Sequence, residues 1–189
     1  MTNEETGEEQ DHYYCFTSHY LNEAQVRDER NKHYLDWVEK GHLVETPGNV
    51  TDYVRVVDDL ARDANELMLR ELAFDPFHAE PLVQFLQARG DWNQSVECMG
   101  IRQTWENLSP PMKEFEALIS ARRFHHDGNP VLAWMIGNTR CKIGRSDDWY
   151  PERKNVTRKI DGTIAILLAL NRLMKIEADS YTEPRIRWI

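Results

Sequence analysis

Long apolar runs and clustered cysteines are both scarce in this chain of 189 residues. No stretch approaches the roughly 18 consecutive apolar residues that a membrane span needs, so we expect no membrane contact. Three cysteines, Cys15, Cys98 and Cys141, lie far apart without metal-site spacing, which is typical of a protein from a reducing compartment. The acidic N-terminus also lacks the apolar core of a signal peptide, so we expect a cytoplasmic protein.

Several common catalytic motifs are absent as well. The chain has no Gly-x-x-x-x-Gly-Lys-Ser/Thr loop, which excludes nucleotide hydrolysis of the usual phosphate-loop type. It has neither a Gly-x-Ser-x-Gly elbow nor a Gly-x-Gly-x-x-Gly nucleotide loop. Excess positive charge is missing too, because the formal net charge is −9. A protein that holds nucleic acid through bulk positive charge is therefore not expected.

The charge is distributed unevenly along the chain. Residues 1–11 form an acidic segment that we expect to be a solvated tail. The stretch 140–158 is basic, and its cations are Arg140, Lys142, Arg145, Arg153, Lys154 and Arg158. Charge alone leaves two interpretations of this stretch open, a surface that contacts phosphate groups and an ordinary solvated loop.

Length and composition indicate one compact domain. A hydrophobic share of 41% with 10% aromatic residues is globular, and 189 residues are too few for two ordinary domains. We expect the acidic tail over residues 1–11, the domain over 12–178 and a C-terminal tail over 179–189.

Periodicity and turn residues predict alternating helices and strands. The expected strands cover residues 12–20, 42–46, 69–74 and 95–99. The expected helices begin after Asn22, run through 34–38 to a stop at Gly41, begin again at Thr51 or Asp52, and cover 78–89. Later helices are expected after a Ser109 cap with Pro110 at the first position, over 130–137 and over 161–176, with an irregular or hairpin region at 138–153. This order predicts an α/β fold with a partly parallel sheet.

Two aspartates stand at the ends of apolar elements in this scheme. Asp75 follows the strand 69–74, and Asp161 begins the strongest helix. Carboxylates at such positions can converge and hold a divalent metal, which indicates a phosphodiester-cleaving site. Each also has a purely structural interpretation, because Asp75-Pro76 is ordinary turn chemistry and Asp161 is a good helix cap.

His125 and His126 raise the question of a zinc site or a general base. No cysteine or histidine partner has the necessary spacing, so the segment from Asp127 to Pro130 is better interpreted as a turn that starts a helix. Four tryptophans, Trp92, Trp105, Trp134 and Trp149, suit base stacking, although packing in the core or at its rim is their default interpretation.

Several sequence blocks occur together in one order. They are Tyr34-Leu35-x-Trp37-Val38-x-x-Gly41-x-Leu43-x-x-Thr46-Pro47-Gly48, Phe74-Asp75-Pro76, Leu108-Ser109-x-Pro111-Met112-Lys113-x-x-Glu116, His126-Asp127-Gly128-Asn129-Pro130-Val131-Leu132-x-Trp134-Met135-x-x-Asn138 and Lys154-x-x-x-x-Lys159-Ile160-Asp161-Gly162-x-x-Ala165. From about residue 16 to 176 the chain resembles the C-terminal nuclease domain of the large terminase subunit of tailed bacteriophages, of the HK97-like type.

The resemblance implies a ribonuclease H-like fold, with a central mixed sheet flanked by helices. It implies cleavage of concatemeric double-stranded viral DNA with two Mg²⁺ or Mn²⁺ ions, which activate water and stabilise the displacement at phosphorus. Asp75 and Asp161 match the second and third acidic residues of the family and would both be metal ligands. His126, Asn138, Lys154 and Lys159 match positions near that site. The implied partners are viral DNA, the small terminase subunit and the portal, in the cytoplasm of a bacterial host.

Two departures from the family pattern lead to a further expectation. The segment upstream of Tyr13 holds only acidic tail, so we expect the first strand and its aspartate to be absent, together with the ATPase domain. Such a domain would expose a sheet edge that invites pairing. The alternative function is therefore a non-catalytic packaging or interaction module, or a prophage remnant, which would need an upstream terminase fragment for activity.

Overall fold

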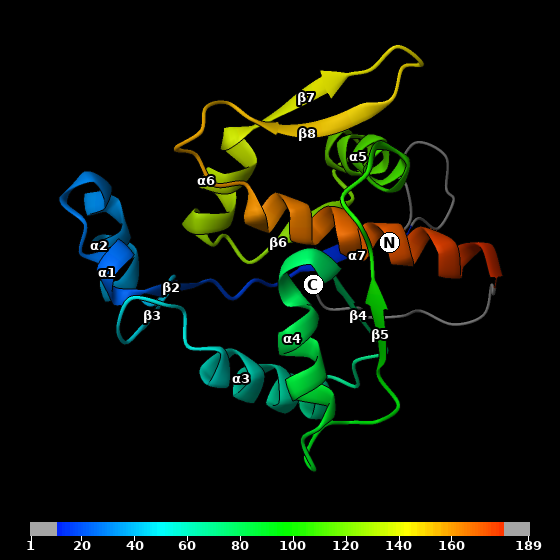
Figure 1. Cartoon of the computed structure of the whole chain (residues 1–189). Coiled ribbons are helices and arrows are strands. Elements are labelled where there is room, and N and C mark those ends of the chain that lie inside the picture. Colours follow the sequence, from blue (N-terminus) through cyan, green and yellow to red (C-terminus); the bar gives the residue numbers. More distant parts are fainter. Residues whose placement is uncertain (1–10, 180–189) are drawn as a thin grey trace.

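The computed structural model describes residues 11–179, which form a mixed α/β fold (Figure 1). Its helices are α1 (Glu23–Val26), α2 (Lys32–Glu39), α3 (Tyr53–Glu66), α4 (Pro76–Gln87), α5 (Trp105–Ser120), α6 (Pro130–Asn138) and α7 (Asp161–Asp179), with a 3₁₀ turn, η1, at Glu29–Asn31. Its strands are β1 (Tyr13–Cys15), β2 (Tyr20–Asn22), β3 (Val44–Thr46), β4 (Glu71–Phe74), β5 (Glu97–Gly100), β6 (Phe124–His126), β7 (Thr139–Ile143) and β8 (Trp149–Arg153). Both expected tails lie almost entirely outside the described residues.

The strands pair two by two. Parallel pairs join β1 to β6, β2 to β3 and β4 to β5, and β7 and β8 form the expected antiparallel hairpin. The single central mixed sheet expected from the sequence is therefore not formed among residues 11–179. The strands of the three parallel pairs are only three or four residues long, and within this part of the chain no ladder connects one pair to another.

Helix α7 is the centre of the main core. It crosses the molecule between the β7–β8 hairpin and the strands β4 and β5 (Figure 1). Its Ile166, Leu167 and Leu170 are at most 2% exposed and pack with Leu108 and Leu118 of α5. Burial of each such side chain contributes about 1.5–3 kcal/mol. The helix expected over 161–176 is thereby confirmed.

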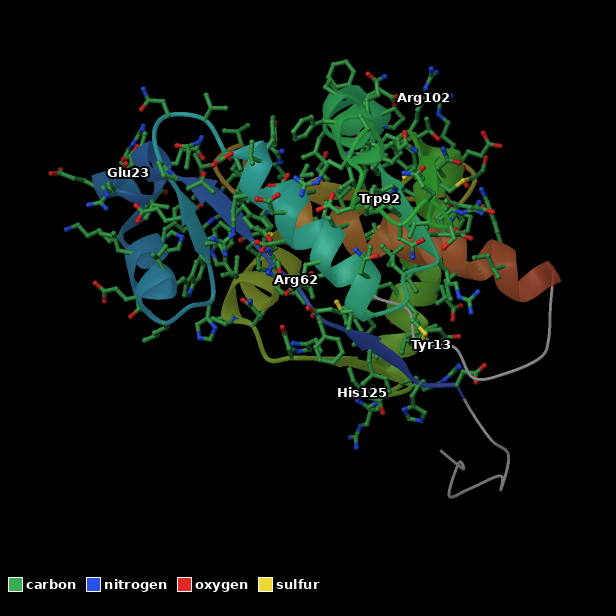
Figure 2. All side chains as sticks on the ribbon, turned by 90° about the horizontal axis from the view of Figure 1, so that it is seen from below. Tyr13, Glu23, Arg62, Trp92, Arg102 and His125 are labelled. Carbon is green, nitrogen blue, oxygen red and sulfur yellow. The ribbon has the colours of Figure 1, made fainter. Side chains whose placement is uncertain are left out.

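Two smaller cores hold the remaining helices. Trp92 packs with the buried faces of α3 and α4 around Val57 and Leu86, so this tryptophan is a core residue (Figure 2). Tyr34 of α2, Leu43 and Val131 of α6 form the third cluster. The cluster matters for the site, because it fixes α2 against α6 beside the beginning of α7.

The predicted caps at Asn22 and Asp52 are confirmed, since each side chain accepts a hydrogen bond from a backbone N–H of the first helical turn. Asn129 caps α6 in the same way. Gly41 follows α2 with φ of +74°, as expected for the residue after a helix. The strand expected over 12–20 is divided, because β1 ends at Cys15 and β2 begins at Tyr20.

The predicted start of α5 at Ser109 is wrong. Thr104 caps this helix, and Pro110 and Pro111 lie inside it. Pro111 cannot donate to the Asn107 carbonyl, and that oxygen instead accepts from Asn171 Nδ2 at 2.8 Å. Ser109 is buried, and its hydroxyl accepts from the Trp149 backbone N–H at 2.9 Å. Tertiary partners therefore replace the local bonds that the cap rule assumes.

The predicted start of α4 also differs from the structure. The helix begins at Pro76 rather than at His78, and Pro81 lies in its interior. Asp75 supplies the cap, which makes Pro76 the first helical residue, a position where its missing N–H costs nothing. No helix among the described residues is long and apolar enough to cross a membrane.

Candidate functional site

A cleft of about 660 Å³ lies where the N-terminus of α7 meets α6 and the segment around β2. Its walls include His19 and Tyr20, Tyr34 of α2, and Lys159 and Asp161 at the start of α7. Residues far apart in the sequence meet here because the small core of Tyr34, Leu43 and Val131 holds α2 against α6. The cleft contains two of the predicted functional residues, Lys159 and Asp161.

Asp161 is the first residue of α7, and its side chain is exposed at the cleft. The first N–H groups of a helix lack intrahelical partners and favour a nearby negative charge. Burial raises the pKa of the Tyr34 hydroxyl, and the negative charge of Asp161 raises it further, so the two groups interact across the cleft. Asp161 therefore brings an accessible carboxylate to the cleft, and its position at the start of the helix is the one that the sequence predicts.

Gly162 allows the close packing behind Asp161. A Cβ atom at this position would lie 3.0 Å from Met135 Sδ and 3.2 Å from Leu132 Cδ1, both on α6. The same atom would lie 3.4 Å from His19 Cε1. The glycine thus lets the start of α7 approach both α6 and His19.

His19 is a cleft residue that our interpretation of the sequence missed. Its ring is 9% exposed, and Nε2 lies 3.1 Å from Thr17 Oγ1. Burial lowers the pKa of this imidazole, and the negative charge of Asp127 opposes that effect. A neutral imidazole can accept or donate one proton, and His19 lines the same cleft as Asp161. No motif or spacing marks His19, because its neighbour Gly162 comes from the other end of the chain.

Asp75 serves a structural purpose in this chain. Its Oδ1 accepts from the Phe77 backbone N–H at 3.1 Å, which caps α4, and its Oδ2 accepts from Gln103 Nε2 at 2.7 Å. Asp75 is half-buried and does not line the cleft that contains Asp161. The strand-end position predicted for Asp75 is confirmed, whereas its use as a metal ligand stays a prediction.

The four residues predicted to support the site, His126, Asn138, Lys154 and Lys159, do not lie together. Lys159 lines the cleft with Asp161. Asn138 and Lys154 line a neighbouring cavity of about 510 Å³. Asn138 is buried, donates from Nδ2 to the Lys159 carbonyl at 3.1 Å, and accepts through its own carbonyl from the Lys154 N–H at 2.9 Å. This amide therefore positions the loop that leads into Asp161.

His126 lies in neither cavity. Its ring is exposed at the end of β6, and Nδ1 accepts from the Gly128 N–H at 3.0 Å. The segment forms the predicted turn, since Gly128 has φ of +80° and Asp127 accepts from the Asn129 N–H at 2.9 Å. The neighbouring His125 lies on β6, which pairs with the β1 strand that begins at Tyr13 (Figure 2). Its ring stacks on that of Tyr14 in β1. These contacts agree with the turn interpretation.

A complete two-metal site is not found within residues 11–179. No group of three or more His, Cys, Asp or Glu side chains in this range is arranged to hold a metal ion. Carboxylate oxygens are the correct ligands for Mg²⁺ or Mn²⁺. Neither Asp75 nor Asp161, however, belongs to a group of three potential ligands among the described residues. The described residues alone therefore do not fit the two-ion centre.

The chain matches the family model "Terminase large subunit, endonuclease domain" over residues 8–177. Protein YmfN of Escherichia coli strain K12 is 36% identical over 156 residues, which are 81% of this chain and 33% of that protein. The large terminase subunit of Enterobacteria phage HK97 is 26% identical over 137 residues, 72% of this chain and 27% of that protein.

The crystal structure of the HK97 bacteriophage large terminase has a similar fold, with a TM-score of 0.70 and 25% identity. The match covers 81% of this chain and 32% of the HK97 chain. This chain thus spans a third or less of the length of these relatives. The residues that line both cavities and the two predicted aspartates lie within the range 8–177 that the family model matches.

Proposed function

Because the chain belongs to the terminase large-subunit endonuclease domain family, we propose that it is a divalent-metal-dependent endonuclease that cleaves concatemeric double-stranded viral DNA during packaging. The observation that carries the proposal is the accessible carboxylate of Asp161 at the mouth of a cleft, within the region that the family model matches. The proposed fold class is ribonuclease H-like.

The proposed ligands are Asp75 and Asp161, with Mg²⁺ or Mn²⁺ as the metal. Bound divalent ions would neutralise charge on the phosphate and supply an activated water. The described residues do not complete a two-ion site, so further ligands must be contributed by groups outside residues 11–179 or by the DNA. We therefore derive no reaction step through the ions.

The residues around Asp161 support nucleic-acid chemistry in other ways. Lys159 brings a positive charge to the same cleft, and a lysine ammonium is a common phosphate ligand. Asn138 fixes the backbone of Lys159 through its side-chain amide. The positive end of the α7 dipole lies next to Asp161, where a helix N-terminus favours a bound anion. The cleft thus combines a potential metal ligand with groups that attract phosphate.

Partners follow from the family and are part of the proposal. They are viral double-stranded DNA, an ATPase-containing part of a large terminase subunit, the small terminase subunit and the portal, in the cytoplasm of a bacterial host. The relatives are about three times longer than the matched region, which is consistent with an ATPase part elsewhere in such proteins.

Cleavage of supercoiled plasmid with Mn²⁺ tests the proposal. The variants are Asp161→Asn and Asp75→Asn, because asparagine retains the size of each side chain and the cap at position 75. Asp148→Asn is the matched control, since Asp148 is an exposed carboxylate in the β7–β8 turn. We expect the wild type and the control to nick the plasmid. The nicking rate of both test variants should be at least 100-fold lower, and EDTA should abolish nicking by every protein.

Two results would contradict the proposal. Equal activity of the wild type and both test variants would exclude Asp75 and Asp161 from the site. No cleavage by this chain alone, with cleavage on addition of an upstream terminase fragment, would instead establish the alternative, a packaging module that is not catalytic by itself.

A further inference from the structure

The base of the β7–β8 hairpin meets the C-terminal end of α6 (Figure 1). The second cavity is lined by residues from this junction. Its volume is about 510 Å³, and three of its lining side chains are Arg140 of β7, Lys154 after β8 and Arg158 in the loop before α7. No aspartate or glutamate lines it. The cavity is therefore strongly positive in a chain whose overall charge is negative.

These three cations form no ion pair within residues 11–179, a property that they share with Arg70, Arg102, Arg122, Arg123, Arg145 and Arg153. Arg27, Arg30, Arg55, Arg62, Arg89 and Arg172 each have a carboxylate within 3.2 Å. In the part of the chain that the structure describes, Arg140, Lys154 and Arg158 form no such pair. Like charges that share one cavity repel one another, so an anion that enters would be favoured.

The end of α6 does not account for the cations. A helix C-terminus attracts positive charge through its free carbonyl groups. Three of those four groups have other donors. Thr139 Oγ1 donates to the Met135 carbonyl, the Thr139 N–H donates to the Ile136 carbonyl, and the Lys154 N–H donates to the Asn138 carbonyl. The positive side chains thus remain available.

Trp134 connects this cavity to the cleft of Asp161. The Trp134 ring lines both cavities, and the Arg158 guanidinium lies 6.0 Å from its centroid. Such a cation–π contact orients Arg158 without cancelling its charge. The packing of Trp134 against Tyr34 and Trp37 fixes the ring, so the arginine is held at the border between the two cavities.

We propose that the cavity of Arg140, Lys154 and Arg158 binds a backbone phosphate of duplex DNA next to the cleavage cleft. One arginine guanidinium can donate two parallel hydrogen bonds to two oxygens of a phosphate. Phosphate contacts also set the register of a duplex on a protein. The inference rests on the proposed function for the identity of the anion. Its consequence is that Arg140 and Arg158 are positioning residues, which hold the strand while the groups around Asp161 act.

The test is fluorescence anisotropy with a labelled 30-base-pair duplex in EDTA, so that no cleavage occurs. The test variant is Arg140→Ala/Arg158→Ala. The control is Arg70→Ala/Lys175→Ala, which removes the same number of positive charges from exposed residues that line neither cavity. We expect the test variant to bind DNA at least tenfold more weakly at 100 mM salt and to reduce the slope of log K against log [salt] by about 1–2, since each phosphate contact contributes about 0.9. The control should stay within about twofold of the wild type.

Equal weakening of DNA binding in the test and control double variants would overturn the proposal, because the loss of bulk positive charge would then explain the weaker binding. Arg140→Gln/Arg158→Gln guards against misfolding, and it should reproduce the loss with an unchanged melting temperature. Calorimetric titration with inorganic phosphate distinguishes a free-phosphate site, and tight phosphate binding without selective loss of DNA binding would also overturn it. Selective loss in a chain that never cleaves DNA would retain this inference and refute the proposed function.

Discussion

Arg172 of α7 and Glu71 of β4 form an ion pair, with Nε and Oε2 2.8 Å apart and both side chains less than one fifth exposed. The pair joins the two elements that carry the predicted aspartates, because β4 ends directly before Asp75 and α7 begins at Asp161. It is the contact most suited to fix β4 along α7, because partly buried charges are costly to separate.

We expect Arg172→Ala to reduce the free energy of unfolding by about 2 kcal/mol, because Glu71 would keep a half-buried charge without a partner. Urea denaturation at pH 7 measures this change. Arg30→Ala is the control, since Arg30 pairs with Asp28 but is 87% exposed, and it should change stability by less than about 0.5 kcal/mol. Equal effects of the two variants would show that the Arg172 pair has no special weight.

Asp59 predicts a pH-dependent contribution to stability. It is 7% exposed and accepts hydrogen bonds from Tyr20 Oη, Arg55 Nε and Arg62 at 2.8–2.9 Å. Burial raises the pKa of this carboxyl, but the bonds from Arg55, Tyr20 and Arg62 outweigh burial, so the pKa lies below its ordinary value. The stabilisation is therefore complete above the unfolded pKa of about 3.9 and is lost as the pH falls through the folded pKa.

The corresponding variant is Asp59→Asn, which should be about 2–3 kcal/mol less stable than the wild type at pH 7. The difference should remain constant down to about pH 5 and shrink below about pH 4, because protonation then removes the same charge from the wild type. Urea denaturation of both proteins across this range measures it. A difference that grows on acidification would contradict the assignment.

The cysteines should differ sharply in reactivity. Cys15 is 0% exposed, and burial together with the negative charge of Asp127 raises the pKa of its thiol to about 12. Cys141 is exposed on the hairpin. Because the thiolate is the reactive form, iodoacetamide at pH 8 should modify Cys141 and leave Cys15 unmodified until the protein unfolds. Peptide mass spectrometry of native and urea-treated protein checks this, and early modification of Cys15 would contradict its burial.

Local sequence signals predicted much of the secondary structure. Asn22, Asp52 and Gly41 mark helix ends correctly because each acts through its own or adjacent backbone groups. The start of α5 was missed because Pro111 leaves the Asn107 carbonyl without its helical donor. Asn171, which lies 64 residues after Asn107, donates to that carbonyl instead. The pairing of short strands likewise depends on distant partners, so the separate two-stranded sheets could not be predicted from periodicity.

The site was predictable only in part. Family blocks identified Asp161 and Lys159, which do share a cleft, and the charge pattern indicated the basic stretch 140–158. Neither signal showed which of its cations converge, because Arg140, Lys154 and Arg158 meet only when the hairpin folds against α6. His19 was missed for a similar reason, since only the fold brings it next to Gly162 and into the cleft of Asp161.

The central claim is that Asp75 and Asp161 hold the same divalent ions, and Mn²⁺ binding measured by electron paramagnetic resonance tests it most directly. Titration of the wild type, Asp75→Asn, Asp161→Asn and the Asp148→Asn control, each with bound duplex DNA, gives the dissociation constants without any need for cleavage. We predict that both test variants bind Mn²⁺ at least tenfold more weakly than the wild type, while the control is unchanged. Wild-type Mn²⁺ affinity in either test variant would contradict the claim.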